Sequence, residues 1–381
     1  MPLKTLILCI LFVSTLMPPA ALAQKEYLST VPDEVLYLQD LKPDHTLDPD
    51  RLDPLIDFAL NTTVKESDLP DLDGMSGAFF RFRIPTGITE IIDYAYNPEV
   101  PAHVFRPSSV RYTQWKDRRI NREAASTIRD LARSPKDYPL VVRGLEYEEI
   151  TPDRFSGAYY GYDQLRTLAL FESANATVFI SVSRQDEKSK VGHKGAILGE
   201  DTDWRYFYSP EKGITKSGLG WADSYMYSGF TVTVYTQRQG EAETTAMCFN
   251  WLDAGWMGMN FVKSKHILSG LKRFARDASA VLSHPDLPDA ETIAAFHKKL
   301  KNCPQEELAA LHTEILSTEC AESDNDLLQE YCPKIRSGDF SEQVPGKYLR
   351  AAIGLLQFKK WLKKSDQGPD PSQTPCLSGS P

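Results

Sequence analysis

Residues 243–282 read ETTAMCFNWLDAGWMGMNFVKSKHILSGLKRFARDASAVL, a strand-like segment followed by a helix-like one. Glu243–Trp251 has the β-branched and aromatic residues typical of a strand. In Asp253–Leu282, residues spaced three and four apart fall on one face, so we predict one long helix that Asp253 caps and His284-Pro285 ends. The residues on that face are Trp256, Asn260, Ser264, Ile267, Leu271, Phe274, Ala278 and Val281.

The residues before this helix predict an antiparallel sheet. Segments with strand character follow one another through short turns, such as SANA at 173–176 and RQGE at 238–241. Turns of this length join antiparallel neighbours and are too short for a parallel crossover. One helix, Arg119–Ala132, is predicted among them. The predicted strands are Ala78–Ile84, Ile88–Tyr96, Leu140–Tyr147, Leu165–Glu172, Thr177–Arg184, Trp204–Tyr208, Ser224–Gln237 and Glu243–Trp251.

The fold class is therefore α+β, an antiparallel β-sheet over 76–284 packed by one long helix. This order of elements resembles the layout of helix-grip domains such as the START-like lipid-binding proteins. The resemblance implies that an apolar ligand is held between sheet and helix. It is a resemblance of element order, and it assigns no residue of this chain to a function.

Two features indicate where a ligand would bind. Asn260 and Ser264 interrupt the buried face of the predicted helix, and buried polar groups need partners. They either bond the sheet or an interior water, or face a cavity. The second feature is a high density of tyrosines, which suit either a pocket wall or a half-exposed sheet. The candidate ligand-binding residues are Trp256, Asn260, Ser264, Tyr206, Tyr208, Tyr225 and Tyr227.

Residues 285–364 predict a separate helical region. Pro304 suits a first helical turn, where its missing N–H does no harm. The polar segment 365–381 is expected to be disordered unless Cys376 holds it. The predicted helices are Ala290–Asn302, Pro304–Glu319, Asp324–Tyr331 and Gly346–Lys364.

The cysteines predict at least one disulfide in this helical region. Cys248 lies in an apolar run and is expected to be a free buried thiol. A straight helix over 304–319 would place Cys303 and Cys320 roughly 25 Å apart, too far for a bridge. The other pairings remain open. The disulfide candidates are Cys303, Cys320, Cys332 and Cys376.

The first 23 residues have the pattern of a cleavable signal peptide. A basic start precedes the apolar run Thr5–Met17, and Ala21-Leu22-Ala23 forms a small-x-small cleavage site before Gln24. The mature protein is therefore expected to be secreted or periplasmic, with no transmembrane segment after cleavage. The following 24–75 is an acidic, proline-rich segment in which Leu52, Leu55 and their neighbours predict one short helix.

Composition and motifs exclude several functions. The formal net charge is −9, which lacks the basic footprint of a nucleic-acid binder. We find no sequence motif for a metal, a cofactor or a catalytic nucleophile, so no catalytic residue is assigned, and no cofactor is expected. Whether the chain has activity stays open, and a non-catalytic role is favoured.

Three functions remain in view. The first is an exported protein that binds an apolar or amphipathic ligand between sheet and helix. The second is an extracytoplasmic hydrolase, which would need convergent titratable groups at a cleft. The third is an interaction protein that docks an unknown protein partner through its C-terminal helices, which would need an exposed apolar patch there.

Overall fold

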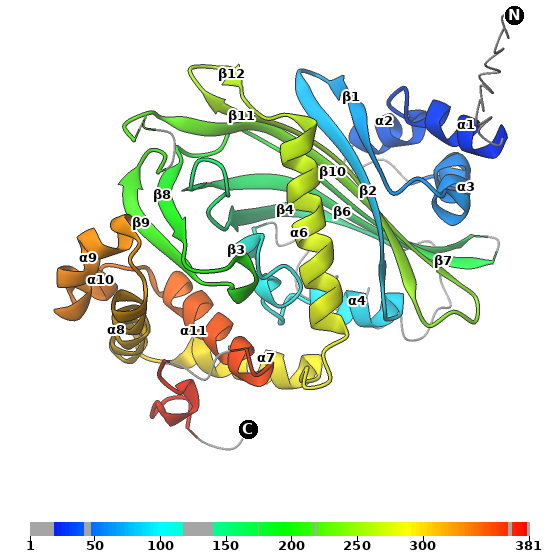
Figure 1. Cartoon of the computed structure of the whole chain (residues 1–381). Helices are drawn as coiled ribbons and strands as arrows, with labels where there is room; N and C mark the ends of the chain where they lie inside the picture. The colour runs from blue at the N-terminus through cyan, green and yellow to red at the C-terminus, as the bar shows by residue number, and fades with distance from the viewer. Residues whose placement is uncertain are drawn as a thin grey trace, which may run out of the picture.

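The computed structural model describes residues 19–41, 47–116, 140–173, 175–215, 218, 220–364 and 368–378. Within these residues, nine strands form one antiparallel sheet in the order β1-β2-β11-β10-β7-β6-β4-β3, with β12 paired to β11. A second sheet has the order β5-β8-β9. One long helix, α6, lies across the main sheet, as Figure 1 shows. The α+β class is therefore confirmed.

Seven of the eight predicted strand segments are strands in the structure, several of them longer than predicted. The prediction missed β1, β3, β5, β8 and β12. The strands are β1 Glu66–Leu72, β2 Met75–Ile84, β3 Val110–Trp115, β4 Leu140–Ile150, β5 Ala158–Tyr159, β6 Gly161–Ser173, β7 Ala176–Gln185, β8 His193–Ile197, β9 Tyr206–Lys212, β10 Ser224–Arg238, β11 Thr244–Trp256 and β12 Met259–Asn260.

Most of the described helices come either before the first strand or after the last one, and α4 lies between β2 and β3. The predicted helix at 119–132 lies outside the described residues. The helices are α1 Pro19–Tyr27, α2 Asp33–Gln39, α3 Asp53–Asn61, α4 Ile88–Ala95, α6 Ser264–Leu282, α7 Ala290–Asn302, α8 Gln305–Glu322, α9 Asp326–Arg336, α10 Asp339–Glu342 and α11 Gly346–Trp361.

Helices cover both faces of the main sheet. On one face, α2 and α3 bury Val35, Leu55 and Phe58 in one cluster with strand residues such as Phe79 and Val232. We expected one helix in the segment 24–75. The structure has α2, α3 and the end of α1 there, and the same segment also forms the edge strand β1. On the other face lie α4 and α6. Helices therefore shield the central part of the sheet on both faces.

The long helix is shorter than predicted, because β11 continues where we placed its first turns. The chain reverses at Met257 and Gly258, whose φ angles are 55° and 75°. Positive φ at two successive turn residues is typical of a type I′ hairpin, and a glycine favours it. β12 then returns beside Gly255, where a side chain would collide with the backbone of Met259. Helix α6 begins only at Ser264.

The prediction of a strand at Ile88–Tyr96 is also wrong, because this segment is helix α4. Its buried residues Ile88, Ile91 and Ile92 have the spacing of one helical face. The β-branched isoleucines led us to predict a strand, but packing against the sheet and Phe105 decides the conformation.

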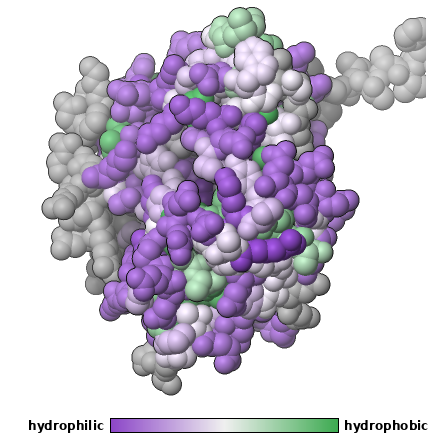
Figure 2. All heavy atoms as spheres, turned by 90° about the vertical axis from the view of Figure 1, so that its left-hand side faces the viewer, coloured by the Kyte–Doolittle hydropathy of each residue, from purple (hydrophilic) through white to green (hydrophobic). Residues whose placement is uncertain are grey.

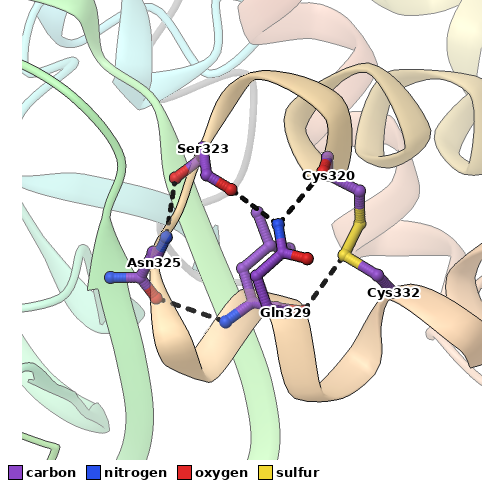
Figure 3. Close-up of a disulfide and its surroundings, with 6 residues drawn as sticks. Cys320, Ser323, Asn325, Gln329 and Cys332 are labelled. Atoms are coloured by element: carbon purple, nitrogen blue, oxygen red, sulfur yellow. Dashed lines mark hydrogen bonds between the residues drawn. A yellow bond between two sulfur atoms is a disulfide. The ribbon is translucent and has the colours of Figure 1, made fainter.

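The C-terminal region is helical, as predicted, and two disulfides connect it. Cys303 bridges to Cys376 and Cys320 to Cys332, while Cys248 is free and buried. The second bridge closes the turn between α8 and α9, which Figure 3 shows. There Gln329 donates hydrogen bonds to the carbonyl oxygens of Cys320 at 3.0 Å and Ser323 at 2.6 Å. The turn is therefore fixed by both covalent and polar contacts.

The tail is ordered where Cys376 holds it. Residues 368–378 are described, and they include a 3-10 turn at Pro371–Gln373 and the buried side chain of Leu377. This part of 365–381 is therefore ordered. We expected the segment to be disordered unless Cys376 held it, and the bridge from Cys376 to Cys303 does so. Among the described residues, none of the helices is both long enough and apolar enough to span a membrane.

Candidate functional site: a cavity between the sheet and α6

A patch of small side chains on three central strands creates the space for a cavity. Along β7 and β10, Thr233 pairs with Ser181 and Thr231 with Ser183, and both threonines pair with β11 on the other side. These side chains face α6, whereas their strand neighbours point into the apolar core beneath α2 and α3. Small residues in register cannot fill the distance to a packed helix. The patch consists of Ser181, Ser183, Thr231, Thr233, Cys248 and Asn250.

The resulting space, which we call the sheet cavity, has a volume of about 570 Å³. Its wall opposite the patch comes from α6, through Ile267, Leu271 and Phe274. Apolar side chains of β10, β11 and the segment before α6 extend this wall, among them Met226 and Val262. The volume and the largely apolar wall are those of a small-molecule site.

One end of the sheet cavity is lined by charged side chains whose charges cancel in ion pairs. Arg106 pairs with Glu148 at 2.8 Å, and Arg166 pairs with Glu146 at 2.8 Å. Tyr162 donates a hydrogen bond to Glu148 at 2.8 Å. Burial alone would raise the pKa of Glu148, but the charges of Arg106 and Arg166 outweigh it and hold that pKa below its ordinary value. Glu148 therefore stays ionised and paired, and this end offers fixed charges and hydrogen-bonding groups.

The other end opens between aromatic residues. Phe155 contacts His266, with their ring centroids 3.8 Å apart, and Trp256 stacks on Phe261 at 3.9 Å. All four line the sheet cavity. Phe155 and Phe261 are 61% and 40% exposed. Apolar atoms also gather at the top of the face in Figure 2, at the height where Figure 1 labels β12. The entrance thus has an apolar rim.

Of the seven predicted binding residues, Trp256 lines the sheet cavity. It lies on β11 and not, as we had expected, on a helix. Ser264 is the first residue of α6 and lies outside the lining. The four tyrosines lie elsewhere. Tyr206 accepts a hydrogen bond from Arg273, Tyr208 packs against Arg111, Tyr225 contacts Lys188, and Tyr227 accepts a hydrogen bond from the N–H of Gly258. Ligand contact by these residues stays a prediction.

The side chain of Asn260 bonds backbone groups of the strands, which is one of the two alternatives left open by the sequence. Its Oδ1 accepts from the N–H groups of Ala254 at 3.3 Å and Val262 at 2.9 Å. Its Nδ2 donates to the carbonyl oxygens of Gly74 at 3.2 Å and Leu252 at 3.4 Å. Asn260 therefore ties β12 to β11 and to the β1–β2 turn, and the polar break in the sequence has a structural cause.

Sequence reasoning missed the residues that create the cavity. The alternation of serine and threonine with valine and phenylalanine in β7 and β10 is the signal that could have revealed them. This alternation normally indicates one solvent-facing side of a sheet. Here that side is covered by α6, so the small polar side chains face an enclosed space.

Comparisons with known proteins give little to add to this geometry. No family model and no curated protein matches the chain. Among solved structures, the chain is similar to the crystal structure of human STARD10, with 12% identity and a TM-score of 0.31. That match covers 62% of this chain and 81% of STARD10. A TM-score this low carries no argument, so the fold is described from the strands and helices of this chain.

Among the described residues that line the sheet cavity, neither a Ser-His-Asp triad nor an activated cysteine is formed. Ser156, Asp153 and His266 all line it, but Ser156 donates its hydroxyl proton directly to Asp153, and the Nδ1 atom of His266 accepts the N–H of Lys263. In a Ser-His-Asp triad the serine hydroxyl donates to the histidine, and the contacts of Ser156 and His266 do not include that bond. Burial raises the pKa of the Cys248 thiol to about 12, so no thiolate forms near neutral pH. The described residues contain no group of three side chains placed to hold a metal ion.

Proposed function

We propose that this protein binds an apolar or amphipathic small molecule in the sheet cavity and does so outside the cytoplasm. The observation that carries the proposal is the in-register patch of six small side chains beneath α6. Natural cores are closely packed, and a sequence that places serine, threonine, cysteine and asparagine at these positions forgoes the packing that large apolar side chains would provide. A bound ligand would recover the lost contacts.

The two ends of the sheet cavity favour an amphipathic ligand over a purely apolar one. The apolar part would lie against Ile267, Leu271 and Phe274, and the apolar rim would allow it to enter. A polar group would reach the ion pairs of Arg106 and Arg166, whose remaining N–H groups can donate hydrogen bonds. The ligand would enter past Phe155 and Phe261.

Export is supported by the leader pattern in residues 1–23 and by the two disulfides, which persist in oxidising compartments. N-terminal sequencing of protein recovered from its own compartment tests this part. We expect the chain to begin at Gln24. Recovery of a cytoplasmic form that retains Met1 would contradict it.

Native mass spectrometry of protein purified without denaturation tests ligand binding. We expect a mass above that of the mature chain with two disulfides, and loss of the excess after delipidation. Delipidated protein should then bind dansyl-labelled undecanoic acid with a blue shift and increase in dansyl fluorescence, as the probe enters an apolar site.

Two variants make this test specific. Leu271→Trp, on the cavity wall, should block the probe, whereas Ala280→Trp, at a position of α6 that does not line the cavity, should leave binding unchanged. Near-ultraviolet circular dichroism checks that both variants fold. Equal binding by Leu271→Trp and the wild type would contradict the proposal.

A further inference from the structure

A second cavity lies beyond the polar end of the sheet cavity. It has a volume of about 500 Å³ and is enclosed by the segment after α4, by β3, and by α7 and α11. We call it the basic cavity. It shares Tyr96, Arg106 and Arg166 with the sheet cavity, so the buried ion pairs separate the two spaces.

The lining of the basic cavity carries an excess of positive charge. Its carboxylates are Glu99 and Glu146. Two further carboxylates outside the lining neutralise part of the excess, because Glu148 pairs with Arg106 and Glu149 pairs with Arg111 at 2.7 Å. Two positive charges remain after all four carboxylates are counted. The cationic side chains of the lining are Arg106, Arg111, Arg166, Lys301, Lys347 and Arg350.

Lys347 and Arg350 are the cations that lack a carboxylate partner among the described residues. They are three residues apart on α11 and so share one face of the helix. Lys347 lies over the rings of Tyr112, Tyr147 and Tyr348 at 4.7–5.0 Å, which holds the ammonium group in place. Burial lowers the pKa of Lys347 below its ordinary value, and the negative charge of Glu149, which is already paired with Arg111, offsets only part of this effect.

Two buried polar groups in the same lining also lack partners among the described residues. The amide Nδ2 of Asn97 forms no hydrogen bond, although the residue is only 6% exposed and its Oδ1 accepts from the N–H of Glu99. The Nδ1 atom of His297 is likewise unpaired. Burial, with Lys301 and Arg350 nearby, lowers the pKa of His297 to about 4, so the ring is neutral near pH 7. Unpaired buried donors are costly, and a ligand that accepts from them removes that cost.

We propose that the basic cavity binds an oxyanion, a phosphate or a carboxylate, through Lys347 and Arg350, with the Nδ2 of Asn97 as a further donor. The guanidinium of Arg350 can bind two oxygens of such a group at once, and Lys347 supplies a point charge. The oxyanion belongs either to a free small molecule or to the headgroup of a ligand whose apolar part occupies the sheet cavity. Only the second source rests on the proposed function.

Isothermal titration calorimetry with inorganic phosphate, on the delipidated full-length mature protein, tests the first source. Arg350→Gln and Lys347→Gln should each weaken binding roughly tenfold to hundredfold, the range for one charge-assisted hydrogen bond. Arg83→Gln is the matched control, because Arg83 is 70% exposed and pairs with Glu243 away from both cavities. Its phosphate affinity should equal that of the wild type. Thermal melts of all variants report whether they fold.

Titration with a lysophosphatidic acid and with the uncharged monoacylglycerol of the same chain length tests the second source. If the headgroup occupies the basic cavity, the charged lipid binds more tightly, and Arg350→Gln removes that advantage without weakening the neutral lipid. Phosphate binding that depends on Arg350 supports the free anion. If Arg350→Gln and Lys347→Gln fold but weaken the binding of neither phosphate nor the charged lipid, the proposal is overturned.

The two proposals fail separately in these titrations. Binding of the neutral lipid without any dependence on Arg350 or Lys347 leaves the sheet cavity as a ligand site and removes the anion site. Phosphate binding that depends on Arg350, without binding of either lipid, keeps the anion site and contradicts the proposed function.

Discussion

Filling the sheet cavity from its floor should block ligand binding without loss of stability. Ser183 and Thr231 face each other on β7 and β10, and neither side chain forms a hydrogen bond within the described part of the chain. The double variant Ser183→Ile, Thr231→Ile adds about five carbons to the space below α6. Isoleucine also suits a strand.

The sign of the stability change distinguishes an empty space from a packed core. Each carbon removed from water contributes about 0.8 kcal/mol, so the free energy of unfolding should rise by between zero and about 4 kcal/mol. In a packed core, each enlargement would instead cost about 1–3 kcal/mol. Urea unfolding with an unchanged m-value measures the difference.

Val234→Phe is the matched control for this experiment. Val234 is on β10, like Thr231, but points into the packed cluster beneath α2 and α3, so its enlargement should lower stability by about 1–3 kcal/mol. The dansyl probe should bind to Val234→Phe and not to the double variant. A double variant as unstable as Val234→Phe, or one that still binds the probe at wild-type affinity, would refute the reasoning.

Three other predictions concern stability. Asn260→Leu leaves four backbone groups without their partner, so urea unfolding should show a loss of about 2–4 kcal/mol; a change within 0.5 kcal/mol, the usual range for a surface substitution, would contradict the bonding role. Removing the disulfide that spans 73 residues should cost about 4.4 kcal/mol, and removing the one that spans 12 about 2.8 kcal/mol, so melts in which the shorter bridge matters more would contradict the loop-entropy account. Burial lowers the folded-state pKa of His103 and His312 to about 3, while their unfolded pKa is about 6.5. The unfolded chain therefore takes up these protons first, and stability should be complete above about pH 6.5 and fall below it by up to about 1.4 kcal/mol per pH unit for each residue. His312→Gln should reduce this slope, and an equal slope in wild type and variant would contradict the assignment.

The sequence predicted the elements whose own pattern determines their structure. The apolar spacing of Ile267, Leu271, Ala278 and Val281 identifies the buried face of α6, and three of the four predicted C-terminal helices have bounds within a few residues of those in the structure, which adds the short helix α10. Distance along a helix ruled out a Cys303–Cys320 bridge. These inferences depend on local geometry, which one segment carries by itself.

Contacts between segments that are distant in the sequence determine the features that the sequence analysis missed. The turn at Met257 and Gly258 forms because β12 pairs with β11 and the side chain of Asn260 holds the two strands together. The helical spacing of these residues in the sequence does not reveal that strand pairing is more favourable here than a helix. The isoleucines of α4 adopt a helix because they pack on the sheet. The candidate site was missed for the same reason. Ser183 and Thr231 look like exposed strand residues until α6 is placed above them.

A crystal structure of the protein with a terminally brominated fatty acid tests the central claim most directly. The anomalous signal of bromine locates the apolar end of the probe directly. We predict a bromine peak between α6 and the small side chains of β7, β10 and β11, on the side of Met226 and Val262 and away from Arg106 and Arg166. A structure in which protein side chains fill this space, or in which bromine binds only elsewhere, would contradict the account.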